Sequence, residues 1–339
     1  MNKRYLVIIL VFIILINVSF IFCKSYFSGV KIGNTKKNNK SISEILLNKI
    51  NYNKNIIQNH EFQKCMNKSF DENNFSKELK TKKEKIISLY DDLDANFMYT
   101  DLIDDYSFGK DINEESYAAS VTKLPLAIYI YKEADKGNID LNKEITFLPK
   151  YEIRGSGILK EKDYYKKYKI KTVLEYIIRY SDNVSYDMLL DEIGGTDKVK
   201  NYFSKLGYEI KYYDNFDDIT PSLGNGYIKE VYKYYLSGSK NAKKLVDDMI
   251  NSDNSKYVKT GDVLVAHKYG EYVEGGGYYN DVSLNFTDYP FALSITSTLG
   301  YSDEMENLFK KSHELSISFN ELYYTEKYNY CKGKAHILN

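Results

Sequence analysis

The chain contains no tryptophan, only three cysteines and four histidines, and no excess of either charge, with 47 basic and 47 acidic side chains among 339 residues. Three cysteines cannot form a framework of several disulfides, and four scattered histidines do not indicate a zinc site. A net charge of zero argues against a nucleic-acid-binding protein, because such proteins carry a basic excess. The chain is 43% hydrophobic and 28% charged, so it can bury a substantial core.

The N-terminus combines a short basic start with a long uncharged apolar run. Lys3 and Arg4 precede the 18 residues from Tyr5 to Phe22, which are just enough to cross a bilayer. No small-residue cleavage site follows. Basic residues stay on the cytoplasmic side, so we expect residues 1–23 to be a single-pass signal anchor in the cell membrane, with the remainder extracytoplasmic. Secretion after signal cleavage is the alternative.

Residues 24–78 are rich in Asn, Lys and Ser and show only weak helical periodicity, so we expect an extracytoplasmic tether. A folded domain over residues 79–321 and a C-terminal tail over 322–339 complete the predicted organisation. Cys65 and Cys331 flank this domain, and an extracytoplasmic location would permit a disulfide between them, although the sequence alone does not determine the pairing.

Helical and strand-like segments follow each other through the folded domain. The predicted strands are 96–103, 263–269, 278–286 and 291–299, and the predicted helices are 80–93, 119–136, 171–180, 184–193, 196–206, 227–236, 241–250 and 302–320. Residues 104–115 are polar and typical of turns. The simplest assembly is an α+β fold, with one antiparallel sheet flanked by the terminal helices and an inserted all-α lobe at about 120–250. A ligand site is expected between the two lobes.

Ser-x-x-Lys occurs four times, but only the copy at Ser120 and Lys123 opens a long apolar helix directly behind a strand. Residues three apart on a helix lie on one face. A Ser hydroxyl is a weak nucleophile that needs a neighbouring base, and Lys can act as one when burial or a second cation keeps it neutral. Backbone N–H groups at a helix N-terminus can also help to hold a developing oxyanion.

Two further motifs lie downstream. Ser181–Asn183 occupies a tight break between two helices, where the alternative interpretation is a C-cap followed by an N-cap. Lys259–Gly261 is a literal Lys-Thr-Gly, but it precedes a strand. We prefer Lys268–Gly270, because Lys268 lies near the end of an apolar strand and Gly270 lets the backbone approach a ligand closely.

Taken in order, the three motifs resemble the Ser-x-x-Lys, Ser-Asp-Asn and Lys-Thr-Gly set of class A β-lactamases and penicillin-binding proteins, over residues 79–320. The resemblance implies that Ser120 is acylated, that Lys123 is its base, directly or through water, and that Ser181 relays a proton to the leaving nitrogen. It implies that Asn183 binds the substrate amide. It also implies that Lys268 attracts a substrate carboxylate and helps to tune Lys123 and Ser181. No metal or other cofactor is implied.

The resemblance also implies an oxyanion hole built from the backbone N–H groups of Ser120 and Glu271, the residue that follows Gly270.

The sequence departs from the family pattern in two places. Only Gly207 to Ser222 separates two helices where class A enzymes carry a long loop with a deacylating Glu, for which Asp214 or Asp217 are possible substitutes.

The second departure is Tyr269, which replaces the usual small hydroxyl residue. It could either fill part of the substrate site or point away and pack. The resemblance implies a serine hydrolase that acts on a β-lactam or a related amide or ester. The alternatives are a penicillin-binding D-alanyl peptidase-like protein that acts on a D-alanyl peptide or ester, or a β-lactam or cell-wall sensor that acylates with little or no turnover.

Overall fold

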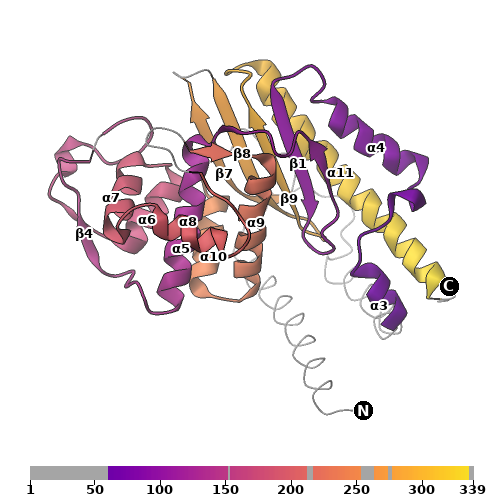
Figure 1. The fold of residues 1–339 in the computed structure, drawn as a ribbon, viewed down its shortest axis with the longest axis horizontal. Helices are drawn as coiled ribbons and strands as arrows, with labels where there is room; N and C mark the ends of the chain where they lie inside the picture. Colours follow the sequence, from indigo (N-terminus) through magenta and orange to yellow (C-terminus); the bar gives the residue numbers. More distant parts are fainter. Residues whose placement is uncertain (1–59, 152, 212–216, 253–262, 274–276, 336–339) are drawn as a thin grey trace, which may run out of the picture. The chain divides into compact units, whose positions relative to one another are not determined.

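The computed structural model describes residues 60–151, 153–211, 217–252, 263–273 and 277–335, and residues 58–339 form one compact unit. Its centre is a five-stranded antiparallel sheet with the order β2-β1-β9-β8-β7 (Figure 1). The strands are β1 (Ala95–Asp101), β2 (Ser107–Lys110), β7 (Leu264–Tyr272), β8 (Tyr278–Phe286) and β9 (Phe291–Ser297). The expectation that the first strand joins the three later ones in a single sheet is confirmed.

Strand β2 was not expected, because it lies in the stretch 104–115 that has the composition of turns. It pairs with β1, placing Phe97 opposite Lys110 and Tyr99 opposite Phe108. Four residues with one buried aromatic side chain, Phe108, are too few to show a period-2 pattern. Tertiary pairing with β1 therefore creates this strand.

One face of the sheet is covered by α4 (Lys77–Ser88) and α11 (Asp303–Lys334), the terminal helices expected there (Figure 1). Each helix begins with a serine cap: Ser76 accepts from the N–H of Leu79, and Ser302 accepts from the N–H of Met305. The core on this face is rich in aromatic residues. Its members include Tyr90, Phe97, Tyr99, Phe108, Phe291, Phe309, Phe319 and Tyr323.

The inserted lobe contains α5 (Lys123–Asp135), α6 (Ile170–Arg179), α7 (Asn183–Ile193), α8 (Asp197–Ser204), α9 (Pro221–Leu236) and α10 (Lys240–Ile250). It is not purely helical, because β4 (Glu144–Thr146) pairs with β5 (Lys167–Lys169). Helix α9 lies directly on the sheet. A Cβ atom at Gly224 would come within 2.6 Å of both Ser294 and Val282, so only glycine allows this approach.

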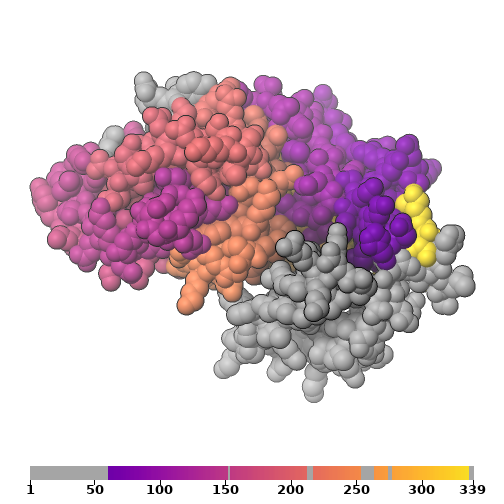
Figure 2. Space-filling model, turned by 60° about the horizontal axis from the view of Figure 1, so that its bottom comes forward, coloured from indigo at the N-terminus to yellow at the C-terminus, as the bar shows by residue number. Residues whose placement is uncertain are grey.

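The folded domain includes more of the chain than the sequence patterns indicated, because residues 60–78 are not a free tether. Helix α3 (His60–Met66) and the following segment pack on α11, and Phe62, Phe70 and Phe75 are buried. The expected tail is equally part of the fold, since α11 continues unbroken to Lys334. Figure 2 shows the yellow end of α11 beside the indigo start of this segment.

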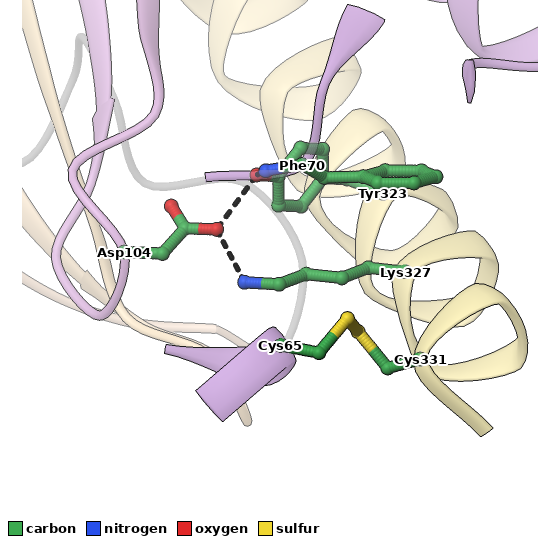
Figure 3. Close-up of a disulfide and its surroundings, with 6 residues drawn as sticks. All are labelled: Cys65, Phe70, Asp104, Tyr323, Lys327 and Cys331. Carbon is green, nitrogen blue, oxygen red and sulfur yellow. Dashed lines mark hydrogen bonds and ion pairs between the residues drawn. A yellow bond between two sulfur atoms is a disulfide. The ribbon is translucent and has the colours of Figure 1, made fainter. Parts of the chain in front are cut away.

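A disulfide between Cys65 and Cys331 closes this contact, and a buried polar cluster lies next to it (Figure 3). Lys327 donates to Asp104 Oδ2 at 2.5 Å, and both side chains are almost fully buried. Tyr323 donates its hydroxyl to the same oxygen at 2.6 Å and accepts from the N–H of Phe70 at 2.8 Å. Tyr323, Lys327 and Cys331 lie four residues apart, so one stripe of α11 makes all these contacts.

None of the helices in the described ranges is long and apolar enough to cross a membrane. The predicted anchor, residues 1–23, lies outside the described residues.

Candidate active site

Ser120 lies on η2 (Ala119–Thr122), a 3₁₀ turn that leads into α5. A single helix from 119 was expected, but α5 begins only at Lys123. Ala119, which directly precedes Ser120, has a φ of 48°, a conformation that an L-residue adopts only when its surroundings hold it. The short strand β3 (Ser116–Tyr117) pairs with β6 (Asp218–Ile219) and anchors the approach to this turn. Ser120 is thereby held partly exposed at the start of α5.

Lys123 contacts Ser120 as the motif spacing predicted. Its Nζ lies 2.7 Å from Ser120 Oγ, 3.0 Å from the Ser181 carbonyl oxygen and 2.5 Å from Asn183 Oδ1. A neutral amine has two hydrogens and one lone pair. When those hydrogens donate to the Ser181 carbonyl and to Asn183, the lone pair is left for the Ser120 hydroxyl.

The environment of Lys123 favours this neutral form. The side chain is 3% exposed, and burial lowers its pKa to about 7, even though the carboxylates of Asp182, Asp187 and Asp217 act in the opposite direction. A lysine with a pKa near 7 is neutral in a large fraction of molecules at physiological pH. Lys123 therefore meets the chemical requirement for a base toward Ser120.

Ser181 lies between the two candidate lysines. Its hydroxyl oxygen is 3.4 Å from Lys123 Nζ and 3.0 Å from Lys268 Nζ. Ser181 is fully buried and has a φ of 52°, so the break between α6 and α7 holds it in a strained backbone conformation. Burial and the nearby charge of Lys123 lower the pKa of Lys268 well below its usual value. These contacts form a chain of proton-carrying groups from Ser120 to Lys268.

The N-cap in the alternative interpretation of Ser181–Asn183 is confirmed for the middle residue. Asp182 is the N-cap of α7, with Oδ1 accepting from the N–H of Ser185 at 2.7 Å. Its Oδ2 accepts from the N–H groups of Ile158 and Leu159 at 2.6 and 2.9 Å. Ser181 and Asn183, by contrast, face Lys123. The middle residue of the motif therefore anchors the loop, and the outer two belong to the site.

Gly270 brings strand β7 against the turn that carries Ser120. A Cβ atom there would lie 2.6 Å from the carbonyl oxygen of Ala118, 2.8 Å from the N of Ser120 and 2.9 Å from the N of Val121. At Gly270 the close approach is to the protein's own backbone. Strand β7 is at the sheet edge, so alternate N–H groups along it face away from β8. Glu271 directly follows Gly270 on this strand.

Tyr269 belongs to the aromatic core under α4 and α11 and is 7% exposed. Its ring also lies against the ammonium of Lys268, with 4.4 Å from Nζ to the ring centroid. The ring therefore packs into the core, as one of the two expectations stated, and also contacts a candidate site lysine.

Asp217 lies next to the same turn. Its carbonyl oxygen accepts from the N–H of Ala118 at 2.6 Å, and its carboxylate accepts a hydrogen bond from the side chain of Thr122. Burial raises the pKa of this carboxyl to about 6, while Thr122 and Lys123 act in the other direction. Asp214 and the literal Lys-Thr-Gly at 259–261 lie outside the described residues.

Two supporting residues were not singled out from the sequence. Ser156 donates its hydroxyl to the Ser181 carbonyl at 2.8 Å, and Asn280 donates its Nδ2 to the Tyr117 carbonyl at 2.7 Å. No local pattern distinguishes them, because their role depends on partners 25 and 163 residues away. In the described part of the chain, no group of three or more His, Cys, Asp or Glu side chains could hold a metal ion.

Solved structures share this arrangement of elements. TLA-3 extended-spectrum β-lactamase superposes with a TM-score of 0.64 at 20% identity, over 72% of this chain and 99% of that one. A β-lactamase from Chitinophaga pinensis gives 0.63 at 19% identity, over 71% and 99%. A variant of PBP-A, solved as an acyl-enzyme complex with penicillin G, also gives 0.63 at 19% identity, over 72% and 97%. These likenesses establish a class A β-lactamase-like fold.

Sequence comparison agrees with the fold. Beta-lactamase VEB-1 from Pseudomonas aeruginosa is 34% identical over 87 residues, which cover 25% of this chain and 29% of that enzyme. The match thus spans less than a third of the length of this curated relative. The model of the beta-lactamase enzyme family matches residues 78–312, the segment that contains every candidate site residue above. The chain therefore belongs to the beta-lactamase enzyme family of serine hydrolases.

Proposed function

We propose that this protein transfers acyl groups through an acyl-enzyme on Ser120, with a β-lactam or a related amide or ester as the acyl donor. The observation that carries the proposal is the contact between Lys123 and Ser120. The two atoms are 2.7 Å apart, and the amine has two other acceptors for its hydrogens. A partly exposed serine hydroxyl that faces the lone pair of a buried lysine is an activated nucleophile.

In the proposed acylation, Ser120 Oγ forms a bond to the carbonyl carbon while its proton passes to Lys123. The backbone N–H groups of Ser120 and Glu271 stabilise the oxyanion. The C–N or C–O bond of the donor then breaks. The leaving atom takes a proton from Ser181, which is replenished from Lys123 through their 3.4 Å contact. Asn183 binds the donor amide.

Deacylation is the step in which this protein is proposed to differ from efficient β-lactamases. The segment from Gly207 to Ser222 is short, and Asp217 is the candidate base for water within its described part. Asp217 is anchored through Thr122, and its pKa of about 6 leaves it ionised at neutral pH. We propose slow turnover through Asp217. The second candidate function, favoured by the same short segment, is a D-alanyl peptidase-like or sensing protein that remains acylated.

We further propose an extracytoplasmic location, on the cell membrane through residues 1–23 or secreted after their removal. The disulfide between Cys65 and Cys331 supports this proposal, because disulfides persist in oxidising compartments. A cytoplasmic position of residue 80 in a protease-protection assay would refute it.

The experiment that tests the proposed chemistry is intact-protein mass spectrometry of the chain from Gln58 onward, after brief and long incubation with benzylpenicillin. Ser120→Ala and Asp217→Asn are measured in parallel. We expect an adduct on the unsubstituted chain that is absent from Ser120→Ala, and a longer-lived adduct on Asp217→Asn. An adduct that survives in Ser120→Ala would show that the nucleophile is a different residue.

The decay of the adduct separates the two candidate functions. Slow loss with release of the hydrolysed antibiotic supports a hydrolase. An adduct that persists equally in the unsubstituted chain and in Asp217→Asn supports the protein that remains acylated.

A further inference from the structure

The ammonium of Lys268 is enclosed by the protein's own groups. Its side chain is fully buried, and Nζ donates to Ser181 Oγ and to the Tyr269 carbonyl oxygen, both at 3.0 Å. The third direction is covered by the face of the Tyr269 ring, whose centroid is 4.4 Å away. An ammonium has three N–H groups and no acceptor, and an aromatic face attracts a cation. Groups of the protein itself therefore occupy the three directions around Lys268 Nζ.

The ring of Tyr269 is held in this position from its other side. It is 7% exposed and packs with the aromatic core that contains Tyr279 and Val265. Moving the ring off Lys268 would break these contacts and expose apolar surface. The ring is thus a fixed part of the wall beside Lys268.

Charges of both signs act on Lys268, namely the cation Lys123 and the carboxylates of Asp281 and Glu271. Glu271, two residues after Tyr269 on β7, has an exposed side chain and interacts electrostatically with Lys268. A carboxylate that approaches Lys268 would meet the negative charge of Glu271 and an ammonium already covered by a ring. A neutral group would not be repelled by a carboxylate and would not need the ammonium as a partner.

We propose that Tyr269 sets the specificity of this site by excluding donors that carry a carboxylate on the leaving-group side, so that the protein prefers neutral esters and amides. This inference rests on the proposed acylation of Ser120 and identifies the class of its acyl donor. It also leaves Lys268 only one of its two expected roles, because Lys268 then acts on Ser181 and not on a substrate carboxylate.

The test compares two probes that differ only in the carboxylate, namely benzylpenicillin and benzylpenicillin methyl ester. Acylation rate constants are measured with the full chain by intact-protein mass spectrometry. Tyr269→Thr removes the ring and leaves a small hydroxyl, and Tyr269→Phe is its matched control, because it keeps the ring. We expect the ester to react at least as fast as the acid on the unsubstituted chain and on Tyr269→Phe. In Tyr269→Thr, the rate for the acid relative to the ester should rise at least tenfold.

A preference of the unsubstituted chain for the acid of tenfold or more overturns the inference, and this result needs no variant to fold. An acid-to-ester ratio that stays the same in Tyr269→Thr also overturns it. Both results leave acylation of Ser120 intact. If neither probe acylates the unsubstituted chain, the proposed function itself fails, and the inference fails with it.

Discussion

The disulfide between Cys65 and Cys331 is predicted to be a main determinant of stability, and replacing both cysteines by alanine tests this. The bond closes a loop of 266 residues, which joins the first helix of the folded unit to the end of α11. Chain entropy gives about 5–6 kcal/mol at 25 °C for a loop of this length, while removal of native disulfides typically costs about 2–5 kcal/mol. The lower range is the better expectation here, because α3 is a helix of only 7 residues and short terminal elements open locally at a lower free energy than the core.

For a domain of this size, each kcal/mol lowers the melting temperature by roughly 2–4 °C, so the double variant should melt about 5–15 °C lower. The assay is thermal unfolding of the chain from Gln58 onward, followed by circular dichroism with and without reducing agent. Reduction should bring the unsubstituted chain down to the melting temperature of the variant. The variant itself should not respond to reduction, which makes it the internal control. Equal melting temperatures for the oxidised chain and the variant would refute the argument.

Three further predictions follow from named contacts. Burial sets the pKa of Lys123 at about 7, so the neutral, basic form of its amine increases as pH rises. The acylation rate should therefore rise through pH 7 and level off above it. Lys123→Arg, whose side chain stays charged, should not be acylated. A pH-independent rate in the unsubstituted chain would contradict this. Gly270→Ala should reduce the acylation rate at least 100-fold, since its Cβ would lie 2.6 Å from the Ala118 carbonyl oxygen. The control Gly333→Ala, which has open space around it, should match the unsubstituted chain. In urea denaturation, Lys327→Met should lower the free energy of unfolding by about 3–5 kcal/mol, because it leaves the buried Asp104 carboxylate without its cationic partner, and adding Asp104→Leu should recover part of this loss. A double variant no more stable than Lys327→Met would contradict this last expectation.

The sheet and most helices were predictable because their signals are local. Apolar residues alternate or recur at helical spacing within each segment, and strands β7, β8 and β9 follow each other with short connections. The misjudged parts lack such signals. Residues 60–78 look polar overall, and their three buried phenylalanines are too widely spaced to form a stripe. Strand β2 forms because β1 provides the neighbouring strand with which it pairs.

The same division applies to the site. Ser120, Lys123, Ser181, Asn183 and Lys268 were named from motif spacing, and the fold brings them together through the contacts that link the two lysines to Ser181. Ser156 and Asn280 could not be named, because each supports a carbonyl far away in the sequence. The role of Gly270 was foreseen as a close approach, but the partner in that approach was not.

The sequence by itself determined which chemical groups this protein can use, in which order they occur along the chain, and which local elements carry them. Only the tertiary structure decided their environment: how deeply Lys123 and Lys268 are buried, which direction the ring of Tyr269 faces, and whether Cys65 meets Cys331. The reason is physical. Helix and strand periods arise between residues a few positions apart, whereas desolvation, pKa shifts and disulfide pairing depend on side chains brought together from distant parts of the chain.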